Sequence, residues 1–192
     1  MKPTRAGLTR AAQLIRSGGV IAFPTDTVYG LAAAADDEVA RRRIYHIKGR
    51  PVGLPLILMV AAPSQLEGWV HVDSRAEGLM RHWWPGPLTL ILHAKGGGTQ
   101  GVRIPKHAVA LDLLRATGPL MTTSANLHGQ DPAMTPGEAG ALAGVVAVLD
   151  GGVAPGGTAS TVLDLTGPEP HVLREGAIST PQLLGPPPPH AG

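Results

Sequence analysis

Apolar residues recur every three or four positions in several stretches of the chain, and short apolar runs separate these stretches. Recurrence at helical spacing predicts amphipathic helices, and the apolar runs between turn-forming residues predict buried strands. The predicted helices cover residues 8–15, 37–48, 74–83 and 108–117, with a shorter one from 136 and another before the C-terminal tail. The predicted strands cover residues 20–23, 56–60, 88–93, 101–104, 120–123, 145–149, 160–165 and 171–174.

The ends of the predicted helices carry recognisable signals. Gly18 and Pro51 stop the first two helices, and Asp73 is placed to cap the third. The segment 135–138, Thr-Pro-Gly-Glu, has the sequence of a capping box with proline at the first helical position. Because helices and strands alternate, we expect an α/β fold around a largely covered sheet, with strand order not readable from the sequence.

Length and composition favour one globular unit. The chain has 192 residues, of which 43% are hydrophobic and 16% charged, a balance that supports a packed core of one domain. We predict a single domain over 1–185 and a proline-rich tail over 186–192, where Pro186 to Pro189 suit an extended conformation. No secretory or membrane-spanning stretch is visible, so a cytoplasmic location without membrane contact is expected.

Charge and cysteine content exclude some classes of chemistry. A net charge of +2 is too small to indicate a nucleic-acid surface by itself, and the chain has no cysteine for a thiolate metal site or nucleophile. The phosphate-loop and dinucleotide fingerprints are absent, and the eight histidines show no metal-ligand spacing. A cation-lined site would therefore have to arise from local clustering.

The first candidate cluster is Lys48-Gly49-Arg50-Pro51, which follows a predicted helix. Cations at a helix C-terminus are often explained by the helix dipole alone. The alternative is a phosphate site, because Gly and Pro shape the backbone for close approach of a ligand, and Lys with Arg binds phosphate oxygens. Composition and spacing leave both interpretations open.

The second cluster, Thr122 to Asn126, follows a predicted buried strand. In open α/β sheets ligands bind beyond the carboxyl ends of strands, so these hydroxyls and this amide are candidates for a pocket wall, with ordinary turn chemistry as the alternative. A hydrolase dyad of Ser124 with Lys48 is disfavoured because the nucleophile elbow is missing.

Weaker candidates lie elsewhere along the chain. Together with the two clusters they predict a cationic, hydroxyl-lined cavity suited to phosphate and a small zwitterion, without an evident nucleophile. These additional candidates are Thr25, Asp26, Thr27, Thr99, Arg103, Ser160 and Arg174.

Seven short strings, in order over about residues 8 to 180, resemble the YrdC-like family. The strings are PTDTVYGL at 24–31, KGRPxxxPL at 48–56, WPGPLTLIL at 84–92, VRIP at 102–105, SAN at 124–126, STVLDL at 160–165 and LREG at 173–176. The resemblance implies a twisted, open mixed sheet with flanking helices and a concave basic cavity. It also implies the short form of the family, without an extra C-terminal domain.

The resemblance further implies an activity. Family members convert L-threonine, bicarbonate and ATP into threonylcarbamoyl-AMP and pyrophosphate. Mg²⁺ is expected as the ion that accompanies ATP. The threonylcarbamoyl group is then passed by a downstream transfer machinery to an adenosine beside the anticodon of tRNA. No metal site follows from a protein motif, and direct RNA contact stays open.

Roles carry over by matching positions. By this resemblance Lys48 and Arg50 are the catalytic residues that hold the triphosphate. The nucleotide-binding residues would be Lys48, Arg50, Thr99, Ser124, Asn126 and Arg174. The L-threonine-binding residues would be Thr27, Arg103, Thr122 and Ser160. Arg103 is the expected partner of the substrate carboxylate, because its fork can bind two oxygens.

Three positions depart from the family pattern. Leu54 and Met59 stand where asparagine and histidine are common, and His128 lies in a loop with an apparent extra residue. Two other functions compete with the synthase: a carbamoyl-adenylate-forming domain like those of hydrogenase maturation factors, and a non-enzymatic RNA-binding module. The first would use carbamoyl phosphate, and the second would bind with steep salt dependence.

Overall fold

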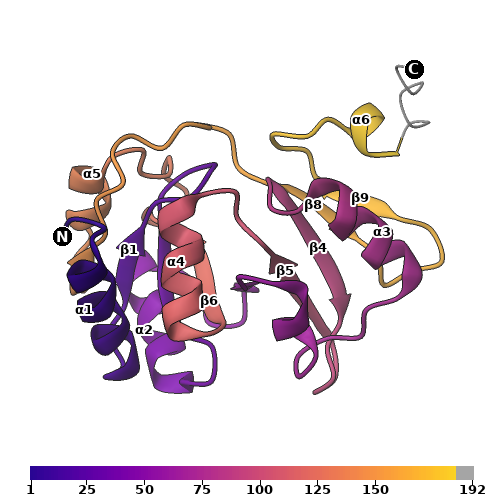
Figure 1. The fold of residues 1–192 in the computed structure, drawn as a ribbon. Coiled ribbons are helices and arrows are strands. Elements are labelled where there is room, and N and C mark those ends of the chain that lie inside the picture. The colour runs from indigo at the N-terminus through magenta and orange to yellow at the C-terminus, as the bar shows by residue number, and fades with distance from the viewer. Residues whose placement is uncertain (185–192) are drawn as a thin grey trace.

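The computed structural model describes residues 1–184, so the predicted proline-rich tail lies outside the described residues. Helices and strands alternate along the chain, as predicted (Figure 1). The helices are α1 (Arg5–Arg16), α2 (Glu38–Lys48), the 3-10 helix η1 (Pro63–Leu66), α3 (Ser74–Trp83), α4 (Ala108–Thr117), α5 (Pro136–Gly140) and α6 (Thr180–Leu184). The strands are β1 (Ile21–Phe23), β2 (Gly30–Ala34), β3 (Ile57–Met59), β4 (Leu88–His93), β5 (Thr99–Arg103), β6 (Leu120–Ser124), β7 (Ala147–Val148), β8 (Thr161–Asp164) and β9 (His171–Arg174).

Within the described chain, the strands form one open sheet in the order β7-β1-β2-β6-β3-β5-β4-β8-β9. The pairs β1–β7, β3–β5 and β4–β8 are parallel, and the other neighbours are antiparallel. The predicted α/β class with an open mixed sheet and flanking helices is therefore confirmed. The order itself was not readable because neighbours such as β6 and β3 are separated by more than 50 residues of sequence.

The cap at Asp73 and the capping box at 135–138 act as predicted, and the structure adds a cap at Asp37 and a stop at Gly49. Asp37 and Asp73 cap α2 and α3 by accepting hydrogen bonds from the amides of Ala40 and Ala76 at 2.9 and 2.8 Å. Thr135 and Glu138 form the capping box of α5. Gly49 ends α2 in the left-handed conformation, with φ of 59°, which favours glycine and turns the chain toward Arg50.

Strand β2 was missed by the sequence analysis. Its sequence, Gly-Leu-Ala-Ala-Ala, lacks the β-branched and aromatic residues that usually mark strands. The structure places β2 between β1 and β6, where small side chains let elements pack closely on both faces. At Gly30 an added Cβ would lie 2.9 Å from a ring carbon of Phe23, so close packing dictates the residue there.

The two faces of the sheet are covered differently. Alternating residues send Ile21 and Phe23 into a core with α1 and α4, and Ala22 into a core with α2 and α3 on the other face. On the α1–α4 face, the core extends past β6 as far as Met59 of β3. Residues of β6, β3, β5 and β4 line the cavity described next, among them the polar Thr122 and Arg103 and the apolar Ile57 and Met59.

Candidate functional site

Nine of the ten residues assigned to the site from sequence line one cavity of about 510 Å³. They come from segments spread over nearly the whole chain, which the order of the strands brings together. The nine are Thr27, Lys48, Arg50, Arg103, Thr122, Ser124, Asn126, Ser160 and Arg174. The volume lies within the range of small-molecule sites.

Thr99 is the residue that the structure does not bring to this cavity. It is exposed at the start of β5, whereas Arg103 lies at the end of that strand, about 13 Å further along an extended chain. Thr99 instead lines a neighbouring pocket of about 340 Å³ with Arg41 and Gln100, and Pro55 lies in the walls of both hollows. Its predicted contact with the nucleotide stays a prediction.

Lys48, the last residue of α2, is buried with 3% of its surface exposed. Its Nζ donates to the carbonyl oxygens of Ser124 and Asn126 at 2.7 and 2.8 Å and to Asn126 Oδ1 at 3.0 Å. The carbonyl of Lys48 accepts from the amide of His128 at 2.8 Å. Lys48 therefore ties the loop 124–128 to α2 from both ends of the residue.

Burial first, and then the nearby Arg50 charge, lower the pKa of Lys48 from 10.5 to about 8. All three N–H groups of the ammonium have protein acceptors. In this structure Lys48 can favour binding of an anion in two ways: through its positive charge, and by holding the loop 124–128 in position. A direct contact with phosphate stays a prediction.

Arg50 lies beside the same loop and retains free hydrogen-bonding capacity. Its guanidinium donates to Thr123 Oγ1 at 3.1 Å and to the carbonyl of Pro55 at 3.2 Å, and it lies 5.8 Å from the ring centroid of Tyr45. Its Nε is buried without a partner. Burial lowers the pKa of Arg50, and within residues 1–184 no carboxylate forms an ion pair with it.

The Ser124–Asn126 loop is held by its own side chains. Ser124 Oγ donates to Asn126 Oδ1 at 2.5 Å, and Asn126 Nδ2 donates to the carbonyls of Leu127 and Gln130 at 2.8 Å. The Lys48 ammonium contacts the carbonyl of Ser124 and not its hydroxyl, so this geometry does not support a Ser–Lys dyad. The loop instead presents polar groups to a ligand.

Arg103 is held on the opposite side of the cavity by three partners. Its Nη2 forms a 2.7 Å ion pair with Asp26 Oδ1, its Nη1 donates to Thr27 Oγ1 at 3.2 Å, and its Nε donates to the carbonyl of Gly86 at 3.0 Å. Burial lowers the pKa of Arg103, and the Asp26 charge opposes that shift. The guanidinium is therefore fixed in orientation.

Hydroxyls and one more cation complete the lining. Arg174 on β9 donates to the carbonyl of Ser160 at 2.8 Å, and Ser160 Oγ lies 2.9 Å from Thr89 Oγ1. Burial lowers the pKa of Arg174. Thr122 donates to the carbonyl of Ile57 at 3.0 Å. Thr89 also lines the cavity, and the sequence did not identify it. The signal that could have done so is its hydroxyl between Leu88 and Leu90 in an otherwise apolar strand.

The lining includes Lys48, Arg50, Arg103 and Arg174 and no aspartate or glutamate. Among the described residues no group of three His, Asp or Glu side chains could hold a metal ion. Of the positions that depart from the family pattern, Met59 and His128 line the cavity, whereas Leu54 is exposed outside it. The cavity is suited to anions whose metal, if any, arrives with them.

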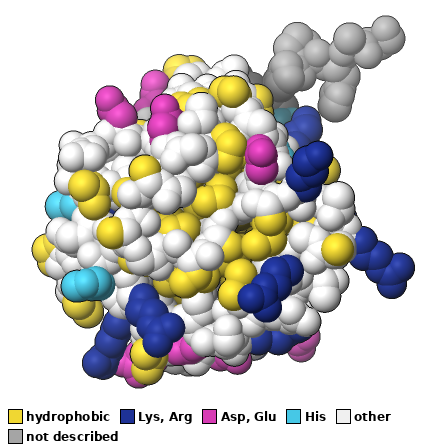
Figure 2. Space-filling model, turned by 90° about the vertical axis from the view of Figure 1, so that its left-hand side faces the viewer, with side chains coloured by type: hydrophobic (Ala, Val, Ile, Leu, Met, Phe, Trp, Pro, Cys, Tyr) yellow, Lys and Arg dark blue, Asp and Glu magenta, His cyan; other side chains and the backbone are white. Residues whose placement is uncertain are grey.

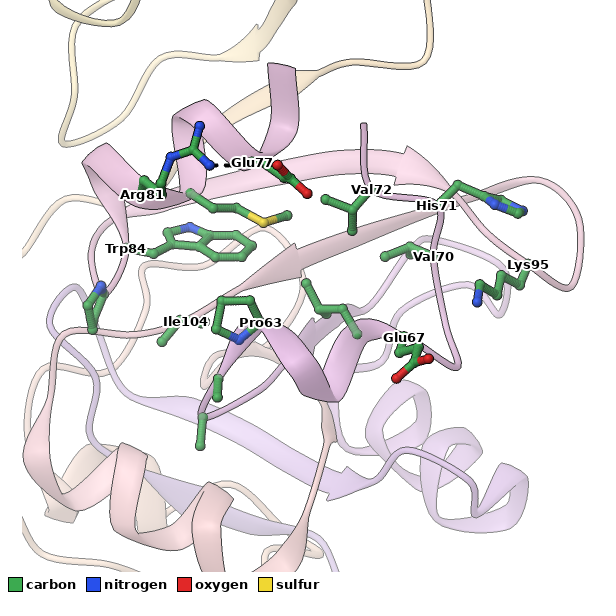
Figure 3. Close-up of a pocket in the computed structure, with 15 residues that line it drawn as sticks. Pro63, Glu67, Val70, His71, Val72, Glu77, Arg81, Trp84, Lys95 and Ile104 are labelled. Atoms are coloured by element: carbon green, nitrogen blue, oxygen red, sulfur yellow. Dashed lines mark ion pairs between the residues drawn. The ribbon is translucent and has the colours of Figure 1, made fainter. Parts of the chain in front are cut away.

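A larger hollow, of about 820 Å³, lies against α3 and is shown in Figure 3. Trp84, Met80 and Ile104 line it, and an ion pair of 3.6 Å joins Glu77 and Arg81 at its edge. It contains none of the ten predicted residues. Ile104 directly follows Arg103, and successive extended residues point to opposite sides, so this apolar hollow and the cationic cavity lie on different sides of the sheet.

Outside the cavity the surface shows no comparable concentration of charge on the side bearing α1 and α5. Figure 2 shows that side, where apolar side chains gather at the centre and basic and acidic side chains stand apart around them. In the described part of the chain, none of the helices has the length and apolar character required to cross a membrane.

Comparisons with known proteins identify the family of the chain. The Sua5_yciO_yrdC family, described as "Telomere recombination", matches residues 13–176. A threonylcarbamoyl-AMP synthase of Bacillus subtilis is 41% identical over 92% of this chain and 55% of its own length. The chain thus spans about half the length of that relative.

Solved structures give the same result. Pyrococcus abyssi Sua5 complexed with L-threonine superposes with a TM-score of 0.87 at 38% identity, covering 90% of this chain and 55% of that one. Escherichia coli YciO superposes with a TM-score of 0.82 at 33% identity, covering 92% and 93% of the two chains. With this fold, this cavity and these matches, the chain belongs to the Sua5/YciO/YrdC family.

Proposed function

We propose that this chain is an L-threonylcarbamoyladenylate synthase, which makes threonylcarbamoyl-AMP and pyrophosphate from L-threonine, bicarbonate and ATP. The observation that carries the proposal is the convergence of nine predicted residues on one cavity whose charged lining residues are all cations. Family membership and a relative named as a threonylcarbamoyl-AMP synthase support it. The relative with bound L-threonine supports an amino-acid substrate.

The two sides of the cavity suit the two substrates. Arg50, with the Ser124–Asn126 loop that Lys48 holds, would bind the triphosphate and nucleotide, and Arg174 would complete that site. Arg103, with Thr27, Thr122 and Ser160, would surround L-threonine. The 510 Å³ volume is of the size that small-molecule ligands fill.

The chemistry requires alignment more than a protein nucleophile. The threonine amine adds to bicarbonate carbon and water leaves, giving a carbamate. A carbamate oxygen then attacks the α-phosphorus of ATP and pyrophosphate departs with the bond electrons. The cations neutralise charge that accumulates on the phosphates in this displacement, and the fixed Arg103 orients the attacking group.

Magnesium would enter with ATP. The cavity lining offers no carboxylate, so the triphosphate oxygens and water would be the ligands of the ion. The product is a labile mixed anhydride, which a downstream tRNA transfer machinery would consume. Since ATP and tRNA are cytoplasmic, we place the reaction in the cytoplasm.

The decisive experiment incubates the protein with ATP, Mg²⁺, L-threonine and labelled bicarbonate and analyses the products by mass. We expect labelled threonylcarbamoyl-AMP, with pyrophosphate release that depends on both threonine and bicarbonate. Pyrophosphate release from ATP with carbamoyl phosphate, in the absence of threonine, would favour the hydrogenase-maturation type of reaction. ATP-independent RNA binding with steep salt dependence and no adenylate would favour the binding module.

A further inference from the structure

Among the described residues, one carboxylate forms an ion pair with a cation of the cavity. Asp26 lies directly behind the lining, and its Oδ1 is 2.7 Å from Arg103 Nη2. Only 11% of the Asp26 side chain and 4% of the Arg103 side chain are exposed. The other ion pairs of the described chain join side chains that are at least 39% exposed. This buried pair is therefore distinct in kind from the others.

The hydrogen bonds of Arg103 leave part of its fork unused. A guanidinium has five N–H donors, and three of those on Arg103 go to Gly86, Thr27 and Asp26. By subtraction, one N–H on each Nη atom remains, and Arg103 lines the cavity. A carboxylate has two oxygens, one for each of these remaining donors.

The segment that carries Asp26 is itself fixed. Thr25 Oγ1 accepts from the amides of Thr27 and Val28 and donates to the carbonyl of Val28 at 2.7 Å. The carbonyl of Thr27 accepts from the amide of Gly157, and an added Cβ at Gly156 would lie 2.5 Å from the carbonyl oxygen of Asp26. The segment Gly156–Gly157 therefore packs closely against the backbone of Asp26 and Thr27 and holds it in place.

The second oxygen of Asp26 does not serve stability. Asp26 Oδ2 is buried without a hydrogen-bond partner among the described residues. An unsatisfied carboxylate oxygen is costly in a buried site. A structural counter-ion for Arg103 would be expected to use both oxygens, whereas a carboxylate that must leave donors free on the arginine would contact it through one.

We propose that Asp26 is a positioning residue for the amino-acid substrate. Its Oδ1 orients the Arg103 guanidinium so that the two remaining N–H groups receive the carboxylate of L-threonine. Its charge also neutralises Arg103, which makes this side of the cavity less attractive to the polyanionic triphosphate. The inference rests on the proposed function. It adds a residue that makes one end of the cavity favour the carboxylate of L-threonine over the triphosphate of ATP.

The test is steady-state kinetics of Asp26→Asn, which keeps the acceptor oxygen and removes the charge. We expect KM for L-threonine to rise by about tenfold or more, with KM for ATP within about twofold of the parent protein. The matched control is Asp112→Asn, which breaks the exposed 2.8 Å pair with Arg115 and should change neither constant. Asp26→Glu, which keeps the charge on a longer side chain, should raise KM for L-threonine less than Asp26→Asn does.

A double-mutant cycle covers the case in which Asp26→Asn folds poorly. Arg103→Met removes the buried charge, and Asp26→Asn in that background should then add nothing to the threonine KM if Asp26 acts through Arg103. An added effect would overturn the proposal, as would parallel changes in both KM values or an unchanged threonine KM. A parent protein without threonine-dependent pyrophosphate release would instead contradict the proposed function.

Discussion

The two sides of the cavity hold their cations in different ways. On the loop side, Lys48 and Arg50 are surrounded by neutral carbonyls, hydroxyls and an amide, and no ion pair with a carboxylate involves them in the described chain. On the paired side, Arg103 forms a buried ion pair with Asp26. Lys48 and Arg103 are both buried, but only Arg103 has its charge balanced by a carboxylate.

The difference suggests two roles: the cations of the loop side attract a ligand by their charge, and Arg103 on the paired side orients a ligand by its hydrogen bonds. Neutral partners hold a cation in place without cancelling its field, which suits a triphosphate with several negative charges. A carboxylate partner cancels the charge but fixes the direction of the remaining donors, which suits the single carboxylate of a zwitterion. We therefore expect the loop side to bind its ligand through charge and the paired side through the geometry of its hydrogen bonds.

The largest effect is expected for Lys48→Met. The change leaves the carbonyls of Ser124 and Asn126 without their donor and removes the charge. We expect kcat/KM for ATP to fall by about 100-fold or more and the free energy of unfolding to fall by about 2 kcal/mol or more. Kinetics and urea denaturation measure the two quantities. Normal turnover in a stable variant would show that the loop is held by other contacts.

Arg50→Ala should affect ATP more selectively. Its partners Thr123 and Pro55 lie at the cavity edge, so stability should change by less than about 1 kcal/mol. KM for ATP should rise by about tenfold, with partial recovery in Arg50→Lys. Arg81→Ala, at the edge of the apolar hollow, is the matched control and should leave ATP binding unchanged. Equal effects of both alanine variants would contradict a local role.

The pH dependence follows from Lys48. Its pKa of about 8 means that the ammonium loses its proton as pH rises through that value. Affinity for ATP should therefore fall above pH 8. Isothermal titration with a non-hydrolysable ATP analogue from pH 7 to 9.5 measures this. A flat profile would indicate that the charge of Lys48 does not contribute to nucleotide binding.

The contribution of Lys48 to stability should rise with pH, whereas the affinity for ATP should fall. The folded pKa of Lys48 is lowered from 10.5, so between about pH 8 and 10.5 the unfolded chain binds more protons at this residue. This residue's contribution to the free energy of unfolding therefore rises with pH across that window. Comparison of parent and Lys48→Met by denaturation at pH 7.5 and 9.5 isolates the contribution.

The smallest effects are expected where the sequence departs from its family. Met59 lines the cavity and pairs with Arg103 across β3 and β5, so Met59→His should change threonine KM by about two- to fivefold. Leu54 lies outside the cavity, and Leu54→Asn should change either KM by less than about twofold. A larger effect of Leu54→Asn would show that the loop after Arg50 closes over bound substrate.

Much of the fold was predictable because local signals agreed with the tertiary structure. The caps at Asp73 and Thr135 predicted helix starts that the structure reproduces. Strand β2 was not predictable because its alanines favour helices in isolation and become a strand only between β1 and β6. Strand order depends on long-range pairing, which local patterns do not encode.

Convergence of the site residues was predictable, but their partners were not. The strings of the sequence identified Lys48 and Arg103 as neighbours of one cavity, which the structure reproduces. That Lys48 binds loop carbonyls and that Asp26 pairs with Arg103 depends on contacts 76 to 78 residues apart in sequence. Thr99, at the start of β5, lines a neighbouring pocket, whereas Arg103 at the end of the same strand lines the cavity, so its predicted nucleotide contact stays a prediction.

The three hydrogen bonds of Lys48 also constrain how this protein can evolve. One side chain joins the end of α2 to a loop 76 to 78 positions later. A substitution that shifts either carbonyl weakens the other segment as well, so changes at residue 48 and in 124–128 should be tolerated only together. Among related proteins, these two segments should therefore vary as a correlated pair, even though neither is near the other in the gene.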